Sequence, residues 1–269
     1  MEYSLKKIKK IGIVGLGQIG GSIAMVLKKK LRGVHISGCD KDKNILNKAY
    51  FVDYKTDNLL DLKAHDLIIL SVPVLEIIKL LDTLSKMRFQ GIIFDTGSTK
   101  KIICEKARGL ELKFVGGHPL TGTEKTAPEA WDIDLFKAKP FFICDIKKDA
   151  NIIKFVSEIV KLIGAHPVPA DPEEHDNMLA LTSHLPYLVS LVFSKNSTNK
   201  LFEGPGFKSF TRIAYQSPEM FADILLTNKE NLRKTFEIIK SQINYFMSNL
   251  HNKEDFIKWV KNDENSKTQ

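Results

Sequence analysis

One histidine of the sequence, His118, sits in a segment whose backbone is constrained on both sides. Gly117 precedes it, Pro119 follows it, and a short apolar run at 113–115 comes just before this loop. An imidazole accepts a proton near neutral pH, which the removal of a hydride from an alcohol requires. His118 is therefore a candidate general base. The alternative is a packed or surface histidine, which is the usual role of a single histidine.

Ser98 is a second candidate, because it follows the apolar run at 92–94 within the segment Asp95-Thr96-Gly97-Ser98-Thr99-Lys100. In doubly wound sheets, ligands bind at the carboxyl ends of the strands. The Ser98 hydroxyl could there hydrogen-bond a substrate hydroxyl or a nicotinamide. The alternative, which composition alone favours, is that Ser98 caps the helix expected a few residues later.

A glycine-rich turn points to a dinucleotide cofactor. It directly follows the apolar run at 10–14 and opens a helical stretch, with the sequence Gly15-Leu16-Gly17-Gln18-Ile19-Gly20. The first glycine allows a tight turn, the second lets the backbone approach a pyrophosphate, and the third lets helix and strand pack closely. The helix N-terminus then faces the phosphates. In this setting the turn predicts a dinucleotide site, the alternative being a glycine-rich turn without a ligand.

Asp40 bears on the choice between the two nicotinamide cofactors. It comes twenty residues after Gly20, at the end of the second apolar run. A carboxylate at that place binds the ribose hydroxyls of NAD and repels the 2′-phosphate of NADP. We therefore expect NAD, although Lys41 and Lys43 weaken the exclusion of NADP.

Three further candidates are Ser71-Val72-Pro73, His184 and Arg212. The first ends an apolar run, either beside the expected nicotinamide or merely where a helix begins. His184 shares a face of a helical stretch with leucines, so the alternative of a satisfied core histidine is strong. Arg212 lies between apolar residues, and a buried arginine needs an anionic partner, either a structural carboxylate or a substrate carboxylate.

Nothing in the sequence indicates a metal site. His175 and His184 are nine residues apart, so they are half a turn out of phase on a helix and form no ligand pair. The three cysteines, Cys39, Cys104 and Cys144, form no CxxC pair. Such a sparse, odd count fits a reducing cytoplasm, where we expect the protein to reside.

The elements that position these residues follow from the hydrophobic pattern. Up to residue 170, short apolar runs alternate with amphipathic stretches, and this alternation predicts a parallel sheet with helices on both faces. We therefore expect an α/β fold, a doubly wound sheet of the Rossmann type. The runs lie at 11–14, 34–39, 67–72, 92–95, 141–144 and 167–170.

Beyond Asp171 the pattern is helical, which predicts a Rossmann domain at 1–170 and an all-α domain at 171–269. In its first expected helix, at 172 to about 196, Pro186 should cause a kink. The other local signals are a glycine-rich loop at 204–206, a helix capped by Ser217, and a capping box formed by Thr227 and Glu230.

Composition argues against two classes of partner. The 40 Lys+Arg against 32 Asp+Glu give a net charge of +8, which suits anionic ligands or plain solubility. No basic run is interleaved with aromatic residues, so we expect no nucleic-acid binding. The apolar stretch at 11–27 holds five glycines and is too short to span a membrane, so we expect no membrane association.

Taken together, five segments resemble the prephenate/arogenate dehydrogenase family. They occur in the family's order between residue 11 and about residue 250, and the combination is far more specific than any one motif. The segments are GLGQIGGS at 15–22, DTGSTK at 95–100, GGHPLTGTE at 116–124, HDNMLALTSHLP at 175–186 and GFKSFTRIAYQSPEMFADI at 206–224.

The resemblance implies a Rossmann domain followed by a helical domain through which the protein forms a homodimer. It also implies that NAD takes a hydride from ring carbon 4 of prephenate and that a ring carboxylate leaves as CO₂, with no need for a metal. His118 would be the base at the 4-hydroxyl and Ser98 would assist there. Arg212 would hold the ring carboxylate, and His184 would line the substrate pocket.

The resemblance leaves the substrate open between prephenate and arogenate, which differ only in a pyruvyl or an alanyl side chain. Phe221 stands where some relatives have Trp, so any substrate contact there is apolar, because Phe lacks the indole donor. Two rival functions are a β-hydroxyacid-type dehydrogenase with Lys100 as the acid/base and a non-catalytic NAD-binding sensor. The GGHP and FTRIA segments argue against the first.

Overall fold

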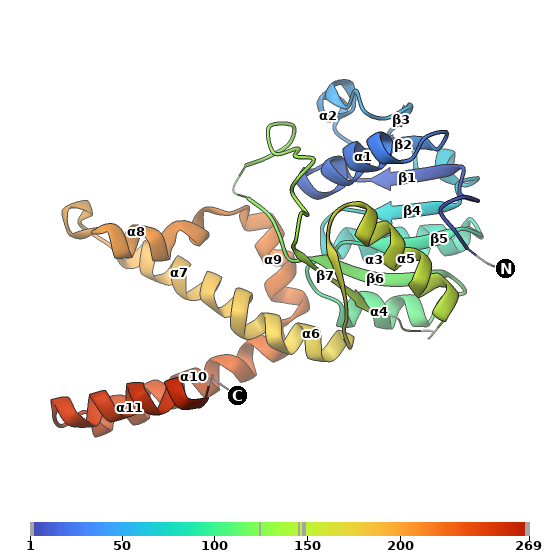
Figure 1. Cartoon of the computed structure of the whole chain (residues 1–269). Coiled ribbons are helices and arrows are strands. Elements are labelled where there is room, and N and C mark those ends of the chain that lie inside the picture. Colours follow the sequence, from blue (N-terminus) through green and yellow to red (C-terminus); the bar gives the residue numbers. More distant parts are fainter. Residues whose placement is uncertain (1–2, 124, 145, 147–148, 267–269) are drawn as a thin grey trace.

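The computed structural model describes residues 3–123, 125–144, 146 and 149–266, and it shows a sheet with its covering helices followed by a group of helices (Figure 1). The strands are β1 Lys10–Val14, β2 His35–Cys39, β3 Tyr54–Thr56, β4 Leu67–Leu70, β5 Ile92–Asp95, β6 Lys113–Pro119, β7 Pro140–Cys144 and β8 His166–Pro169. The helices between them are α1 Gln18–Lys30, α2 Lys43–Lys48, α3 Val74–Lys86, α4 Lys101–Arg108 and α5 Ala150–Leu162, with a 3-10 turn at Leu59–Leu62.

The eight strands form one sheet in the order β3-β2-β1-β4-β5-β6-β7-β8. The chain reverses its direction of travel across the sheet between β1 and β4, which is where doubly wound folds bind their ligands. Because strands β1 to β6 are parallel, their carboxyl ends share one edge of the sheet. The predicted fold class, a Rossmann-type sheet followed by helices, is confirmed.

Alternate residues of the central strands pack into two separate cores. In β4, Leu67 and Ile69 face the core shared with α1 and α5, whereas Ile68 and Leu70 face the core shared with α3 and α4. All four side chains are fully buried. A strand covered on both faces reads as a continuous apolar run, which is why these strands were visible in the sequence.

The expectation of an entirely parallel sheet is wrong for β7, which runs antiparallel to β6. A parallel neighbour requires a crossover connection, usually a helix. The segment between β6 and β7 contains no helix among its described residues, so the chain turns back on itself. By contrast, α5 connects β7 to β8, and that pair is parallel.

His118 lies within β6, so the prediction that a loop holds it is wrong. The strand continues past the apolar run at 113–115 because its second half pairs with β7, and His118 is the partner of Phe142. The first half of β6 pairs with β5. The pairing with β7 fixes the backbone at His118, and hence its imidazole, more firmly than a loop would.

The helical part begins three residues after β8 and continues to Ser266. Its elements are α6 Pro172–Leu179, a π-helical segment Ala180–His184, α7 Leu185–Asn196, a 3-10 turn Lys200–Phe202, α8 Pro205–Thr211, a 3-10 turn Arg212–Tyr215, α9 Pro218–Thr227, α10 Lys229–Asn249 and α11 Lys253–Ser266. The Ser217 side chain accepts from the Met220 N–H, so the predicted cap of α9 is confirmed.

The structure adds to one local prediction for these helices, the kink at Pro186, and corrects two others. The helix from 172 to 196 changes to π geometry ahead of Pro186, with the Leu185 N–H bonded to the Ala180 oxygen, so the missing proline donor is accommodated by a wider turn. Residues 205–206 open α8 and are not a loop. Thr227 caps nothing, because its hydroxyl donates back to the Asp223 carbonyl within α9.

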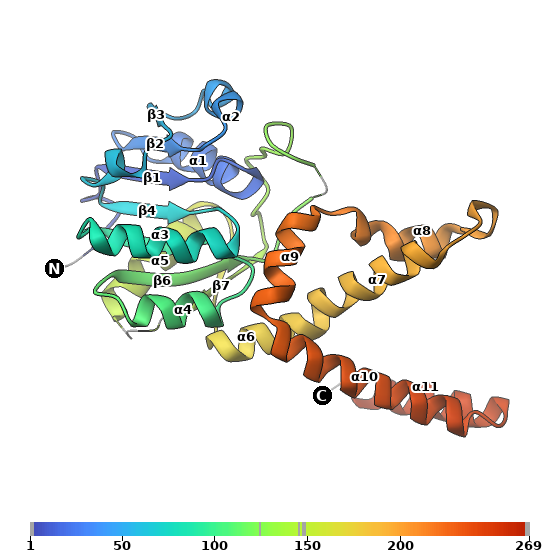
Figure 2. The same cartoon turned by 180° about the vertical axis from the view of Figure 1, so that it is seen from behind.

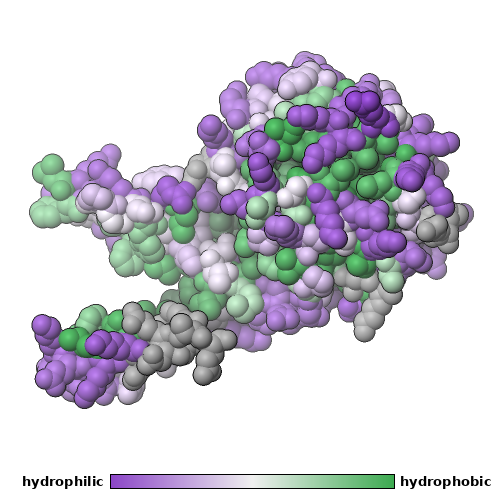
Figure 3. Space-filling view, viewed as in Figure 1, coloured by the Kyte–Doolittle hydropathy of each residue, from purple (hydrophilic) through white to green (hydrophobic). Residues whose placement is uncertain are grey.

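The helical part extends away from the sheet as two arms, one formed by α7 with α8 and the other by α10 with α11 (Figure 2). Apolar side chains lie on the sides of the arms that face each other across a gap (Figure 3). Among the described residues, no helix combines the length and the apolar character needed to cross a membrane.

Candidate active site

A cavity of about 670 Å³ lies at the carboxyl edge of the sheet, against α6, its π-helical extension and α9. Both parts of the chain contribute to its wall, since Phe221 and Ile224 come from α9 while Thr96 follows β5. Most of the predicted site residues lie here. Those that line the cavity are Gly17, Gln18, Ile19, Ser71, Val72, Pro73, Ser98, His118 and His184.

The geometry of the glycine-rich turn fits a dinucleotide. Gly15 has φ +87, and a side chain there would place its Cβ 2.3 Å from the Ser71 carbonyl oxygen. A Cβ on Gly20 would come 1.9 Å from the Gly15 carbonyl oxygen. A Cβ on Gly17 would meet nothing within 4 Å, which leaves open space at the start of α1 where a pyrophosphate binds. Gly15 and Gly20 therefore shape the turn, and the Leu16 side chain is fully buried.

Asp40 lies beside this turn, at the end of β2. One of its carboxylate oxygens accepts from the Leu16 N–H at 2.7 Å, and the other accepts from the Asp42 N–H at 2.9 Å. These bonds fix the carboxylate at the place where the adenosine ribose of NAD binds in this type of fold. Asp40 does not line the main cavity, because the ribose half of such a site lies further along the sheet edge.

The segment between β6 and β7 covers the turn, which the sequence did not indicate. The Gln18 side chain accepts from the Thr123 N–H at 2.9 Å and donates to the Thr123 hydroxyl at 2.5 Å. The Trp131 indole donates to the Leu16 carbonyl at 2.9 Å. Glu124, which ends the GGHPLTGTE segment, lies outside the described residues.

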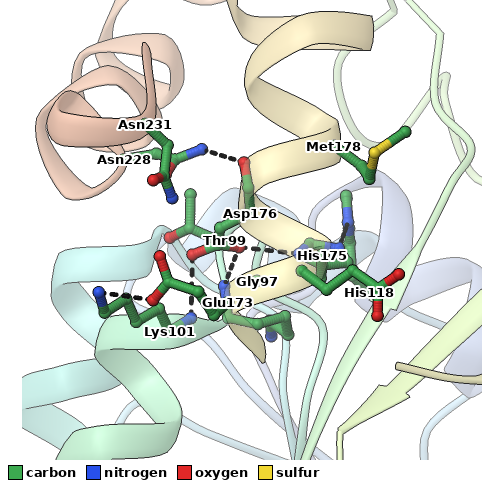
Figure 4. Close-up of polar contacts among 12 residues, drawn as sticks. Gly97, Thr99, Lys101, His118, Glu173, His175, Asp176, Met178, Asn228 and Asn231 are labelled. Carbon is green, nitrogen blue, oxygen red and sulfur yellow. Dashed lines mark hydrogen bonds and ion pairs between the residues drawn. The ribbon is translucent and has the colours of Figure 1, made fainter. Parts of the chain in front are cut away.

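His118 is bonded to a second histidine that sequence reasoning set aside. Its Nδ1 lies 2.9 Å from Nε2 of His175, and Nδ1 of His175 lies 2.8 Å from Oδ1 of Asp176 (Figure 4). All three residues are buried. His175 and Asp176 come from α6, so this contact joins the helical part to the sheet.

A buried ion pair lies beneath these histidines. The Lys100 ammonium donates to the Asp95 carboxylate and, at 2.6 Å, to the Gly117 carbonyl next to His118. Neither side chain is exposed at all. Asp95 also accepts from the Gly97 and Gly117 N–H groups, so the ends of β5 and β6 are held together.

Burial, with the neighbouring His175, Lys100 and His184, holds the pKa of His118 well below its usual 6.5. The imidazole is therefore neutral at physiological pH and able to accept a proton. Burial likewise lowers the pKa of His184 to about 4. The Asn228 side-chain amide donates to Nδ1 of His184 at 3.0 Å, which leaves the ring proton of the neutral form on Nε2.

The neutral histidines should make stability depend on pH. The pKa of His184 is lower in the folded than in the unfolded protein. Its contribution to the free energy of unfolding is therefore fully present above pH 6.5 and is lost as pH falls toward 4. At pH 5 this loss amounts to about 2 kcal/mol. Urea unfolding at pH 8 and pH 5 measures it. The difference in unfolding free energy between the two pH values should shrink in His184→Gln and stay unchanged in His166→Gln, an exposed control. If the difference is the same in both variants, the pH dependence does not come from His184.

Ser98 lines the cavity and caps no helix, because Lys100 occupies the cap position of α4. The capping alternative is therefore wrong. Arg212 is exposed at the start of a 3-10 turn and is not part of the cavity lining, so the expectation of a buried arginine is also wrong in the single chain. Gln216 and Ser217, one turn further along the chain, do line the cavity.

Sequence reasoning missed His175, Asp176 and Asn228. His175 was compared only with His184 on the same helix, whereas its partner is 57 positions away on β6. The remaining signal was that His175 and Asp176 open the segment at 175–186, which belongs to the family pattern. Among the described residues no group of His, Cys, Asp and Glu side chains could hold a metal ion.

Comparison with known proteins agrees with this architecture. The family model described as prephenate dehydrogenase, nucleotide-binding domain, matches residues 23–168, and the model of the prephenate dehydrogenase dimerization domain matches residues 171–262. The crystal structure of prephenate dehydrogenase from A. aeolicus in complex with hydroxyphenyl propionate and NAD⁺ is similar, with a TM-score of 0.87 and 29% identity; the match covers 97% of this chain and 98% of that one.

Two relatives are similar in sequence. Prephenate dehydrogenase of Lactococcus lactis subsp. cremoris is 31% identical over 252 residues, which are 88% of this chain and 70% of that protein. Prephenate dehydrogenase of Bacillus subtilis is 33% identical over 243 residues, which are 84% of this chain and 66% of that protein. Because the two family models match residues 23–168 and 171–262 of the chain, it belongs to the prephenate dehydrogenase family of NAD-dependent oxidoreductases.

Proposed function

We propose that the protein catalyses the oxidative decarboxylation of prephenate to 4-hydroxyphenylpyruvate, with NAD as hydride acceptor. This proposal rests on one observation: Gly17 of the cofactor turn, Ser98 and His118 all line the same cavity. A neutral, buried imidazole beside a nicotinamide site suits the oxidation of a hydroxyl group. Bound NAD supplies the acceptor for the hydride from ring carbon 4.

In this proposal His118 takes the proton of the 4-hydroxyl as the hydride leaves. Ser98 hydrogen-bonds the same hydroxyl and so orients it toward His118. His184 offers its Nε2–H to a substrate oxygen, because Asn228 occupies Nδ1. Phe221 stacks on Tyr187 with ring centroids 3.5 Å apart and gives the cavity an apolar wall toward the substrate ring.

Arogenate is the alternative substrate, since it carries the same ring and the same 4-hydroxyl. The rival β-hydroxyacid-type reaction would use Lys100 as the acid/base. Lys100 is fully buried, pairs with Asp95 and does not line the cavity, which argues against that role. A non-catalytic NAD sensor would have no need for the buried imidazole that faces the cofactor site.

The experiment that tests the function is steady-state kinetics with prephenate and arogenate. We expect turnover with a cyclohexadienyl substrate, measured as NADH formation. Tight NAD binding without turnover of either substrate would support the sensor and contradict the proposal.

Asp40 should make the enzyme prefer NAD. Its carboxylate is fixed by the Leu16 and Asp42 N–H groups, so it cannot turn away from a 2′-phosphate. We expect kcat/KM to be higher with NAD than with NADP. In Asp40→Asn the ratio of these two values should become smaller, because the carboxylate that repels the 2′-phosphate is gone. A wild-type ratio near one or in favour of NADP contradicts this role of Asp40.

We further propose that the protein is a cytoplasmic homodimer assembled through its helical part. Apolar side chains on α10 and α11 remain exposed in the single chain, among them Ile243 at 55% and Trp259 at 50%. Surfaces of this kind mark interaction sites. Light scattering at micromolar concentration should give twice the chain mass of 30.4 kDa, and a monomer mass would refute the dimer.

A further inference from the structure

We infer that His175 and Asp176 are positioning residues that act through His118: they keep its Nε2, the nitrogen that does not contact His175, free of a proton and relay the proton that His118 takes up. This inference rests on the proposed function, because it assigns the two residues a part in the same reaction. Neither lines the cavity, so neither touches the substrate.

Asp176 fixes the direction of every hydrogen bond in this chain of groups. Its Oδ1 accepts from the Lys100 N–H at 2.7 Å and its Oδ2 accepts from the Lys101 N–H at 2.9 Å, at the start of α4. Backbone N–H groups can only donate, so the carboxylate is an acceptor toward both. The helix start also favours a negative charge there.

The proton positions on both imidazoles follow from that carboxylate. Nδ1 of His175 lies 2.8 Å from Oδ1 of Asp176 and must donate to it. In the neutral ring the proton then sits on Nδ1, and Nε2 of His175 is an acceptor. Nδ1 of His118, 2.9 Å away, must therefore donate to it. This leaves the lone pair of His118 on Nε2, the nitrogen not used by His175, and available for the substrate proton.

The same bonds offer the accepted proton a way out of the cavity. When His118 takes the hydroxyl proton on Nε2, both of its nitrogens carry protons and the ring is positively charged. The Nδ1 proton can then move along the existing hydrogen bond to Nε2 of His175. His118 returns to the neutral form, and the positive charge resides on His175, directly bonded to the Asp176 carboxylate.

Asp176 stabilises the positive charge on His175, and no other charged group that the structure describes around the two imidazoles takes this role. From β5 and the start of α4, Asp95 and Lys100 face each other as a buried pair. From the π-helical segment, His184 is neutral because burial lowers its pKa to about 4. Glu173 on α6 pairs with Lys101 at the surface. Asp176 is therefore the only anion bonded to either imidazole within the described part of the chain.

The position of Asp176 is itself fixed from a third direction. Its backbone carbonyl accepts from the Asn228 side-chain amide at 2.7 Å, and Asn231 donates to the Asn228 side-chain oxygen at 2.9 Å (Figure 4). The relay thus joins β6 to α6, and the residues at the start of α10 hold Asp176 in place. Substituting Asp176 would also uncap α4, so His175 is the better residue to test.

Two variants of His175 separate positioning from folding. In His175→Gln the amide oxygen can still accept from the His118 Nδ1–H, but it cannot take up a proton. In His175→Leu neither is possible. His166→Gln and His166→Leu are the matched controls, because His166 is exposed on β8. All variants should bind NAD like the wild type, which checks their folding without using turnover.

The first readout needs no substrate: ¹⁵N NMR spectra of labelled protein, which report the protonated nitrogen of each histidine. We expect His118 to carry its proton on Nδ1 in the wild type and in His175→Gln. In His175→Leu the form protonated on Nε2 should gain population, because the Nδ1 proton has lost its acceptor. A wild-type His118 protonated on Nε2 overturns the assignment.

The second readout is the reaction itself. We expect kcat of His175→Leu to fall about tenfold or more, with His175→Gln in between, since correct protonation of a general base contributes rate of this size. KM should stay within about twofold, because no substrate contact is removed. The acidic limb of the pH–rate profile should shift in both variants. If His175→Leu has the same kcat and the same pH–rate profile as the wild type, the relay is overturned. The spectra can show the expected proton on Nδ1 of His118 while the wild type turns over neither cyclohexadienyl substrate. In that case the proposed function and the relay's part in it fail, but the assignment of the His118 proton stands.

Discussion

Replacing His118 with asparagine is expected to lower kcat about a hundredfold or more, the usual cost of losing a general base. Asparagine has no group that accepts a proton near neutral pH, so the 4-hydroxyl proton would have to leave to water. NAD affinity should hardly change, because the cofactor turn and Asp40 are untouched. The measurements are kcat and KM with prephenate and a separate NAD titration.

The pH–rate profile gives the same variant a second test. The wild type should lose kcat/KM as pH falls through the pKa of His118, which burial holds well below 6.5, because only the neutral ring can act as base. His118→Asn should lack that acidic limb, whereas His166→Asn, the exposed control, should keep it. Near-normal kcat in His118→Asn would mean that another group is the base.

The second large effect is expected for Arg212→Ala, as a rise in KM for prephenate of about tenfold or more. A guanidinium grips a carboxylate through two parallel hydrogen bonds and so orients the ring as well as holding it. Arg212 is exposed and lies one turn before Gln216 and Ser217, which line the cavity. NAD affinity should stay the same, because Arg212 lies outside the sheet domain.

Two further variants complete the test of Arg212. Arg212→Lys should recover only part of the lost affinity, because an ammonium keeps the charge without the planar fork. Lys208→Ala removes an exposed cation from the adjoining α8 and should leave KM unchanged. If Arg212 merely pairs with a carboxylate of the protein, Arg212→Ala should lower thermal stability instead. An unchanged KM in well-folded Arg212→Ala excludes the carboxylate role.

The sheet was predictable because its central strands are buried on both faces. Ile68 and Leu70 alternate with residues of the opposite core, which produces the uninterrupted apolar runs of such strands. The edge strand β3, with only Tyr54, Lys55 and Thr56, has no such run and was missed. The direction of β7 depends on how a segment without a helix folds back, which no local pattern records.

The candidate site was predictable where its chemistry resides in one contiguous segment. The glycines of the cofactor turn carry their reason in the local backbone, and Gly15 adopts a positive φ as expected. The hydrogen bond between His118 and His175 could not be predicted in this way, because the two residues lie 57 positions apart in the sequence. The prediction that Arg212 is buried was wrong because its apolar neighbours in the sequence suggest burial, whereas a short 3-10 turn exposes its side chain.

In the proposed reaction this cavity couples hydride transfer to NAD with loss of the ring carboxylate as CO₂. The most direct test is to mix the enzyme with NAD and prephenate and to measure NADH and CO₂ in the same reaction. We expect the two products to form in equal amounts, together with 4-hydroxyphenylpyruvate, and both to form about a hundredfold more slowly in His118→Asn. Release of CO₂ without NADH, or no NADH although NAD is bound, would contradict it.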